Sequence, residues 1–125
     1  MTALLIFLGA GLGGLARFGL GTMVQQAGGV DFPWGTLIVN ITGSLLIGVL
    51  YMLLEGTPSA TQWRAFLGVG FCGGYTTFSA FSYDTVLMMQ AGNWSRAMLY
   101  AFVSVTACLI ATIAGFRLAT LLRPV

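Results

Sequence analysis

The chain has no histidine and very little charge. Only 6% of its 125 residues are charged, against about 25% in an ordinary soluble domain. Without histidine, and with Asp31, Glu55 and Asp84 as its only carboxylates, it lacks the usual ligands of a catalytic metal and the usual groups of acid–base catalysis. Its five arginines are scattered, too sparse for a nucleic-acid-binding patch. The composition therefore excludes nucleic-acid binding and disfavours an enzyme.

Apolar residues make up 58% of the chain, and its mean hydropathy is +0.93. A water-soluble fold would have nothing to cover its surface, so lipid must be the solvent for most of the molecule. Polar and glycine-rich stretches separate four apolar segments, at about 3–24, 34–54, 62–89 and 94–122, each long enough to cross about 30 Å of hydrocarbon. Trp34, Trp63 and Trp94 lie near the segment starts, at the expected headgroup level. We predict one all-α integral membrane domain over 1–125, with four transmembrane helices.

The third segment contains its own interruption. Glycines between positions 68 and 74 lead into Tyr75-Thr76-Thr77-Phe78-Ser79. Glycine followed by β-branched threonine favours a break near the middle of this segment, and non-helical backbone at membrane depth is tolerated only where its polar groups are satisfied. A break would therefore mark a site. The alternative is an intact, kinked helix whose glycines serve close packing.

Four glycines have the small-xxx-small spacing that lets helix backbones approach closely. They form the pairs Gly9 with Gly13 and Gly70 with Gly74. We interpret these four as helix-packing residues.

The chain is too small to enclose much of a pathway by itself, so we expect an obligate dimer. An even number of crossings puts both termini on one side, with Arg64, Arg117 and Arg123, while Arg96 and Arg17 lie toward the other. The arginine excess that orients membrane proteins is thus near zero. This balance allows insertion both ways and an antiparallel homodimer with its two-fold axis in the membrane plane.

Polar side chains inside apolar segments are costly and indicate function. In the second segment, Thr36, Asn40 and Ser44 are four residues apart and share a helix face. The Asn40 amide could donate hydrogen bonds to an anion without holding it by a full charge. A hydrogen bond between helices is the alternative role, and the sequence supports it nearly as well.

The fourth segment repeats this spacing with Tyr100, Ser104 and Cys108. Such a row of weak donors suits an anion that is losing its water, although serine also commonly bonds to its own helix carbonyls. We interpret the two cysteines, Cys72 and Cys108, as small buried apolar residues rather than as a disulfide or metal site.

After the expected break, Phe78 and Phe81 are three residues apart, as are Ser79 and Ser82. A phenylalanine ring has a positive edge that can contact an anion, although packing against lipid or core is its usual role. Arg17 either extends to the membrane surface or supplies positive potential at a vestibule.

Three segments together resemble the Fluc (CrcB) family of fluoride channels: 13–18 (GGLARF), 33–43 (PWGTLIVNITG) and 70–82 (GFCGGYTTFSAFS). The resemblance implies a passive fluoride channel in a bacterial-type inner membrane, built as an antiparallel homodimer around a structural sodium ion. It implies a pore lined by Phe78, Phe81, Asn40, Thr36, Ser79, Ser82, Tyr100, Ser104 and Cys108. It also implies that Arg17 lies in the vestibule and that the backbone carbonyls of Gly73 and Thr76 hold the sodium.

Two other functions stay open at this point. A small dual-topology multidrug antiporter also packs four crossings into a short chain, but proton coupling requires a titratable carboxylate deep in the membrane, and the first segment has none. A purely structural subunit would have scattered polar residues, whereas the two rows described above each follow one helix face.

Overall fold

The computed structural model describes residues 1–122, which are helical apart from short connections and contain no strand. The long helices are α1 (Thr2–Gly28), α2 (Trp34–Leu53) and α6 (Trp94–Leu122). Between α2 and α6 lie α3 (Ala60–Trp63), the π-helical segment η1 (Arg64–Cys72), α4 (Gly73–Tyr75) and α5 (Phe78–Gln90). The predicted all-α class is confirmed.

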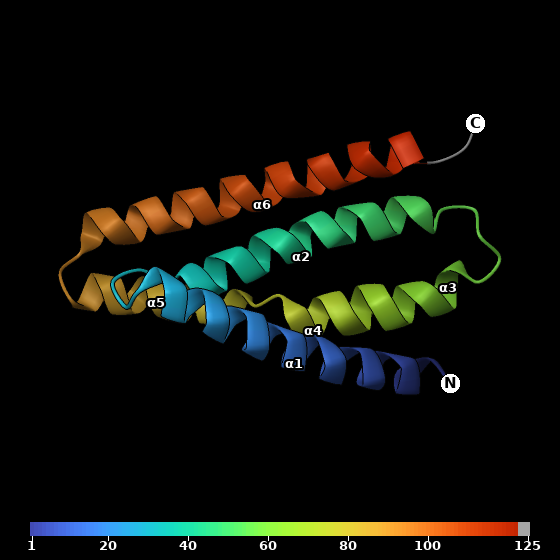
Figure 1. The fold of residues 1–125 in the computed structure, drawn as a ribbon, viewed down its shortest axis with the longest axis horizontal. Coiled ribbons are helices and arrows are strands. Elements are labelled where there is room, and N and C mark those ends of the chain that lie inside the picture. Colours follow the sequence, from blue (N-terminus) through green and yellow to red (C-terminus); the bar gives the residue numbers. More distant parts are fainter. Residues whose placement is uncertain (123–125) are drawn as a thin grey trace.

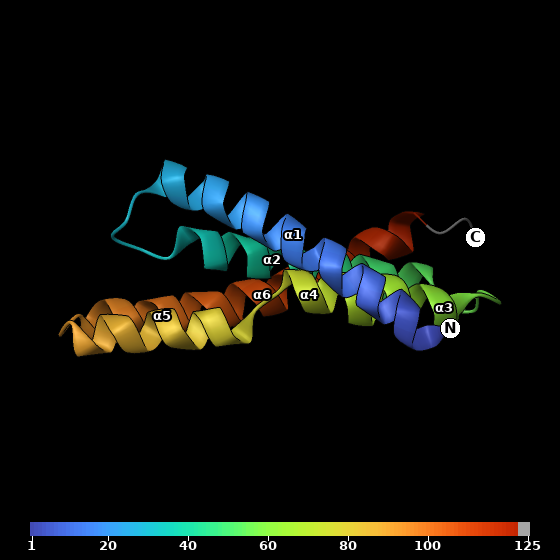
Figure 2. The same ribbon diagram turned by 90° about the horizontal axis from the view of Figure 1, so that it is seen from below.

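The elements run back and forth along one long axis (Figure 1). The start of α1, the end of α6 and the loop after α2 lie at one end, and the loops after α1 and α5 lie at the other. Helix α2 packs against α6, α1 packs against η1, and α5 lies beside α6 (Figure 2). Arg123, which entered the charge balance above, lies outside the described residues.

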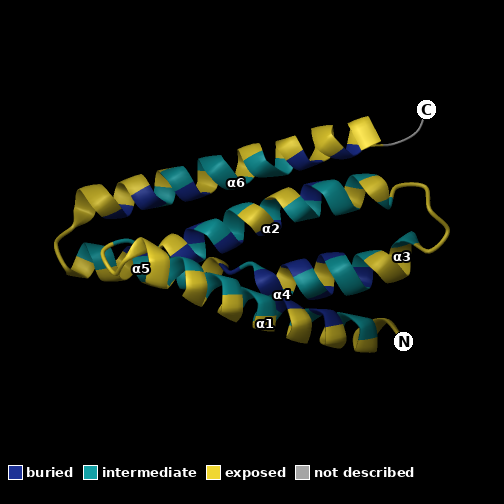
Figure 3. Cartoon of the chain, viewed as in Figure 1, coloured by how far each residue is buried: buried dark blue, intermediate teal, exposed yellow. Residues whose placement is uncertain are grey.

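Three helices, α1, α2 and α6, are long and apolar enough to cross a membrane. Their outer faces carry large exposed apolar side chains such as Leu15 (71% exposed) and Phe102 (70% exposed) (Figure 3). Water would solvate these surfaces poorly, whereas hydrocarbon solvates them well. The chain is therefore a multi-pass integral membrane protein.

Backbone-to-backbone contact joins α1 to η1. A Cβ atom added at Gly9 would overlap the Phe66 carbonyl oxygen, and one at Gly13 would overlap the Phe71 carbonyl oxygen. Glycines four residues apart on α1 thus face carbonyls five residues apart on η1. The wider π-helical turn, with hydrogen bonds five residues apart, matches this spacing.

The other glycine pair completes the same seam from the η1 side. A Cβ at Gly70 would lie 2.9 Å from the Ile6 carbonyl oxygen, and one at Gly74 would overlap the Ala10 carbonyl oxygen. The predicted packing role of all four glycines is confirmed. Close contact of this kind is a main source of helix association in lipid, where the hydrophobic effect is absent.

The first helix extends beyond its predicted end at residue 24. The Gln25 side chain donates to the Phe32 carbonyl at 2.9 Å and accepts from the Gly35 N–H at 3.1 Å. The polar stretch 25–28, which indicated a loop, is instead the last turn of α1. Its Gln25 side chain binds the backbone of the connection to α2 and of the first residues of α2. The helix ends at Gly28, and Gly29 has a φ of 84°, a conformation that glycine adopts at little cost.

Replacing Gly13 by alanine should lower the free energy of unfolding by about 1–3 kcal/mol, the usual cost of overpacking, because the new methyl group overlaps the Phe71 carbonyl. Thermal unfolding in detergent measures the effect. Gly11→Ala is the matched control, since a Cβ there meets no atom within 4 Å. Equal stability of the two variants would contradict the seam.

Candidate functional site

Two extended residues interrupt the helical chain between α4 and α5. Helix α4 ends at Tyr75, Thr76 has φ −80° and ψ 159°, Thr77 has φ −151° and ψ 110°, and α5 begins at Phe78. The glycines from 68 to 74, expected to begin the interruption, are helical instead. The β-branched threonines suit the extended conformation, whereas two of these glycines, Gly70 and Gly74, contact the backbone of α1.

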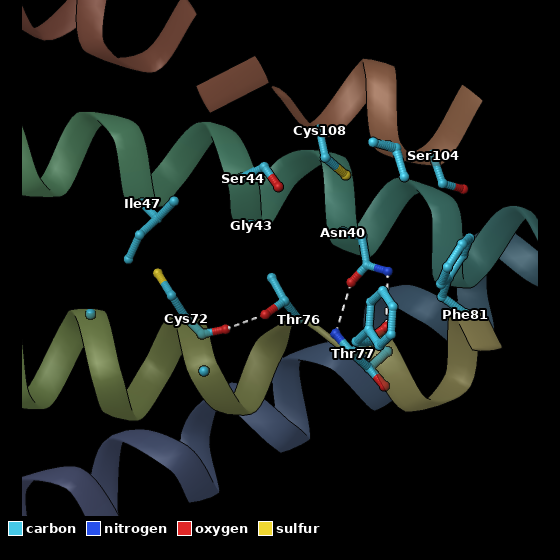
Figure 4. A pocket seen from close by; sticks show the side chains of 14 residues that line it. Asn40, Gly43, Ser44, Ile47, Cys72, Thr76, Thr77, Phe81, Ser104 and Cys108 are labelled. Carbon is cyan, nitrogen blue, oxygen red and sulfur yellow. Dashed lines mark hydrogen bonds between the residues drawn. The ribbon is translucent and has the colours of Figure 1, made fainter. Parts of the chain in front are cut away.

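Asn40 of α2 binds both backbone polar groups of Thr77. Its Nδ2 donates to the Thr77 carbonyl at 3.0 Å, and its Oδ1 accepts from the Thr77 N–H at 2.7 Å (Figure 4). In a continuous α-helix that N–H would bond to the Gly73 carbonyl. The hydrogen bond between helices that was one alternative for Asn40 is therefore present, and one Nδ2 hydrogen remains for another acceptor.

Other side chains satisfy the rest of the interruption. The Thr77 hydroxyl accepts from the Ala80 N–H at 3.1 Å, which makes Thr77 the N-cap of α5. The Thr76 hydroxyl donates to the Cys72 carbonyl at 2.9 Å. The Arg17 guanidinium donates to the Thr76 carbonyl at 3.4 Å. This contact places the Arg17 guanidinium beside the interruption.

The interruption also places two helix ends next to each other. The carbonyl end of α4 carries partial negative charge and the N–H end of α5 carries partial positive charge. Because Thr77 donates to Asn40, the Gly73 carbonyl is left without its helical donor. Such half-helix ends attract cations and anions, respectively, in membrane proteins.

A cavity of about 430 Å³ adjoins the interruption. Figure 4 shows that its walls come from α2, from the chain on both sides of the interruption, and from α6. Most of the expected pore and sodium residues line it: Asn40, Gly73, Thr76, Phe78, Phe81, Ser104 and Cys108. The structure therefore brings together residues from three of the apolar segments.

Two buried hydroxyls of α6 lie together near this cavity. Tyr100 is 0% exposed and Ser104 is 5% exposed. Neither hydroxyl makes a short, well-aligned hydrogen bond within residues 1–122, but each has the other as a polar neighbour, and the Tyr100 hydroxyl also has that of Thr36. The ring of Phe81 lies 5.3 Å, centroid to centroid, from the rings of Tyr100 and of Phe78.

Four expected pore residues do not line the 430 Å³ cavity: Tyr100, described above, and Thr36, Ser79 and Ser82. The Thr36 hydroxyl donates to the Asp84 carboxylate at 2.8 Å, a pairing that the sequence did not predict. The Ser82 hydroxyl donates to the Phe78 carbonyl of its own helix at 2.9 Å. The Ser79 hydroxyl is 3.2 Å from that of Thr77.

A second cavity, of about 520 Å³, contains Arg17 and Thr36. Gln25 and Gln26 at the end of α1 also line it. Thr77 borders both cavities, so the interruption lies between a cavity with a cation and a cavity with weak donors. Sequence reasoning missed Thr77 and Gln25 as organising residues, and it did not pair Asp84 with Thr36. For Asp84, its carboxylate inside an apolar segment was the available signal.

Comparison with known proteins identifies the family. Residues 4–116 match the family described as CrcB-like protein, Camphor Resistance (CrcB). A protein of Coxiella burnetii (strain Dugway 5J108-111) named fluoride-specific ion channel FluC is 50% identical over 111 residues, covering 87% of this chain and 90% of its own length. A protein of Thermus thermophilus with the same name is 49% identical over 116 residues, covering 92% of each chain. The chain belongs to the CrcB family.

Proposed function

We infer that the chain is a passive, fluoride-selective channel that carries fluoride out of the cell and gives fluoride resistance. The observation that carries this inference is the match to fluoride-specific channels at about half identity over most of the chain. The cavity beside the interruption adds chemical support, since its lining includes an amide, two serines and two phenylalanine rings but no carboxylate. Such a lining can replace the water of a small anion without binding it permanently.

A passive pore is sufficient for this task. Hydrogen fluoride is a neutral weak acid that crosses lipid and ionises in a less acidic cytoplasm, which traps the anion. An inside-negative membrane potential then drives fluoride outward, by about 2.3 kcal/mol per 100 mV for one charge. No coupled proton and no ATP are needed.

The alternatives have less support. A proton-coupled antiporter of the considered kind requires a carboxylate in its first crossing, and α1 has none. A purely structural subunit leaves the aligned polar residues of α2 and α6 unexplained. The family is one of channels rather than enzymes.

Within this channel, Asn40 donates its remaining N–H to the anion, and Phe78 and Phe81 present ring edges to it. Tyr100, Ser104 and Cys108 supply the polar track along α6. Arg17 provides positive potential in the vestibule, where it shares a cavity with Thr36. Ser79 and Ser82 do not line the cavity of the single chain. They belong to the pore only if the partner chain of a dimer extends the pore to their side of α5.

The functional unit is an antiparallel homodimer in the cytoplasmic membrane of a bacterium. In each chain, the elements from α3 to α5 form the third of four crossings, broken at Thr76 and Thr77. Phe78 is 76% exposed and Gly73 is also exposed, and both lie beside the cavity that a partner would complete. The nearly balanced arginines support insertion in both orientations.

A structural sodium ion lies on the two-fold axis of this dimer. Carbonyl oxygens are suitable ligands for a hard cation, and the Gly73 carbonyl has lost its helical donor to Asn40. The Thr76 carbonyl accepts from Arg17 at 3.4 Å and keeps a second lone pair. Two chains would bring four such oxygens together, and a monovalent cation would satisfy all of them.

Asn40→Asp should abolish fluoride efflux from liposomes, measured with a fluoride electrode. Like charges a few Å apart repel by about 4 kcal/mol at an effective dielectric constant of about 20, which corresponds to about a thousandfold in rate. The carboxylate also cannot donate to the Thr77 carbonyl, so dimer content is measured by gel filtration alongside flux. Asn93→Asp, the same change in the exposed connection before α6, is the control. Undiminished flux in the Asn40 variant would leave Asn40 a purely structural residue.

Phe81→Ile, and separately Phe78→Ile, should lower fluoride flux more than it lowers dimer stability. Isoleucine keeps the apolar bulk but has no ring edge, and loss of an aromatic pair costs only about 0.5–1.5 kcal/mol. Phe102→Ile on the exposed face of α6 is the matched control and should conduct normally. If both pore variants also conduct normally, the anion does not contact these rings.

Sodium should raise the unfolding temperature of the purified dimer and bind at one ion per two chains in calorimetric titration. A ligand at 100 times its Kd stabilises by about 2.7 kcal/mol. Thr76→Ser should keep this effect, because the ligand is a backbone oxygen, whereas Gly73→Val should lose it.

The structure makes the Gly73 variant informative. Gly73 has ordinary helical angles, φ −64° and ψ −38°, and a Cβ there meets no atom within 4 Å of the single chain. A loss of sodium binding would therefore arise between chains. Gly11→Val, equally open within the chain, should still bind sodium. Identical stability of the wild type with and without sodium would argue against the site.

A further inference from the structure

Arg17 reaches the interruption from the side of α1. Its half-buried guanidinium donates to the Thr76 carbonyl at 3.4 Å, and the side chain also lines the cavity of about 520 Å³, here called the vestibule cavity. Within residues 1–122 no carboxylate lines this cavity. Asp84 accepts from the Thr36 hydroxyl and lines a different cavity, of about 350 Å³. The charge of Arg17 therefore faces the vestibule cavity without a carboxylate on the same wall.

The Thr76 carbonyl belongs to two sites at once. It accepts from Arg17, and it is one of the two carbonyls assigned above to the sodium ion. A guanidinium and a sodium ion that share one oxygen atom both withdraw its electron density and repel each other as like charges. The charge of Arg17 therefore weakens sodium binding, whereas a neutral side chain that only braced the interruption would strengthen it.

An anion in the vestibule cavity changes this balance. A guanidinium has five N–H donors, so it can bind an anion while one donor remains on the Thr76 carbonyl. Hydrogen bonds between two charged groups are stronger than neutral ones. The bound anion offsets the positive charge that acts on the Thr76 oxygen, and this oxygen becomes a better ligand for sodium.

We propose that Arg17 couples the vestibule cavity to the sodium site. Its charge opposes sodium at the shared Thr76 carbonyl, and a small anion bound to the guanidinium removes this opposition. Anion and sodium then raise each other's affinity by the same factor, as linkage requires. A channel that contains fluoride thus holds its central cation more tightly than an empty one. This coupling rests on the fluoride pathway and the structural sodium of the proposed function.

Calorimetric titration of the purified dimer of full-length chains with sodium gluconate measures the coupling. N-methylglucamine gluconate holds the ionic strength constant, and fluoride is supplied as its N-methylglucamine salt. The wild type should bind sodium at least about fivefold more tightly in high fluoride than without it, which is the lower end of typical couplings between sites. A sodium Kd that does not change with fluoride overturns the proposal, and this measurement needs no variant.

Arg17→Gln removes the charge and keeps a hydrogen-bond donor. Without fluoride, it should bind sodium on the order of tenfold more tightly than the wild type, because the repulsion is gone, and fluoride should change its Kd little. Arg17→Lys keeps the charge and should keep both the weaker binding and the response to fluoride. Arg96→Gln is the matched control, since this exposed arginine donates to the Asp31 carbonyl at 3.0 Å, and it should titrate as the wild type does. Gel filtration measures the dimer content of each variant.

The sign of the Arg17→Gln effect separates coupling from bracing. Weaker sodium binding by this variant would mean that the guanidinium only holds the interruption together, and this result overturns the proposal, as does an unchanged Kd. Sodium binding that ignores both fluoride and Arg17 removes the coupling and leaves the structural ion in place.

The proposed function fails in other ways. If neither the wild type nor Arg17→Gln binds sodium, the structural ion is absent and the coupling is refuted with it. Fluoride efflux from liposomes is measured separately with an electrode. Absence of efflux in the wild type would count against the fluoride channel, and the titrations would still decide whether Arg17 links an anion to sodium.

Discussion

The structure depends on the pairing between one side-chain amide and one backbone unit. At membrane depth an unpaired N–H or carbonyl costs several kcal/mol, so two extended residues cannot exist there unless other groups satisfy them. Asn40 binds both polar groups of Thr77, and Arg17 donates to Thr76. These partners come from α2 and α1, so the interruption requires both helices to be in place. The interruption in turn places the end of α4 next to the start of α5 and lies between the two cavities that Thr77 borders.

The helices that supply these partners are held by backbone contact. Gly9 and Gly13 bring α1 against η1. On the other side of the molecule, a Cβ at Gly48 would overlap the Thr112 carbonyl of α6, and one at Gly115 would overlap the Leu45 carbonyl of α2. Because lipid supplies no hydrophobic force between helices, such fitting is what fixes their relative positions. The positions of Asn40 and Arg17 relative to the interruption therefore depend on these glycine contacts between helices.

The sequence predicted the helices that face lipid better than the contacts between them. Helix α2 (Trp34–Leu53) and the described part of α6 (Trp94–Leu122) lie within the apolar segments recognised at 34–54 and 94–122, because a run of apolar residues marks the stretch of chain that lipid surrounds. The π-helical conformation of η1 could not be predicted from the local sequence. It places carbonyl groups opposite glycines of α1, a helix that is distant in the sequence. The partnership of Asn40 with Thr77 spans 37 positions, and composition and periodicity carry no information about such a pair.

The clamp that Asn40 forms on Thr77 is compatible with the anion-donor role proposed for its amide. Only one orientation of the amide satisfies Thr77, because its oxygen must face the N–H and its nitrogen must face the carbonyl. That pairing removes the rotational freedom of the side chain and so fixes the direction of the second Nδ2 hydrogen. A donor whose direction is already fixed needs little reorganisation when an anion arrives. A hydroxyl at this position could not bind both groups of Thr77 and still donate a hydrogen, which is a physical reason for asparagine at residue 40.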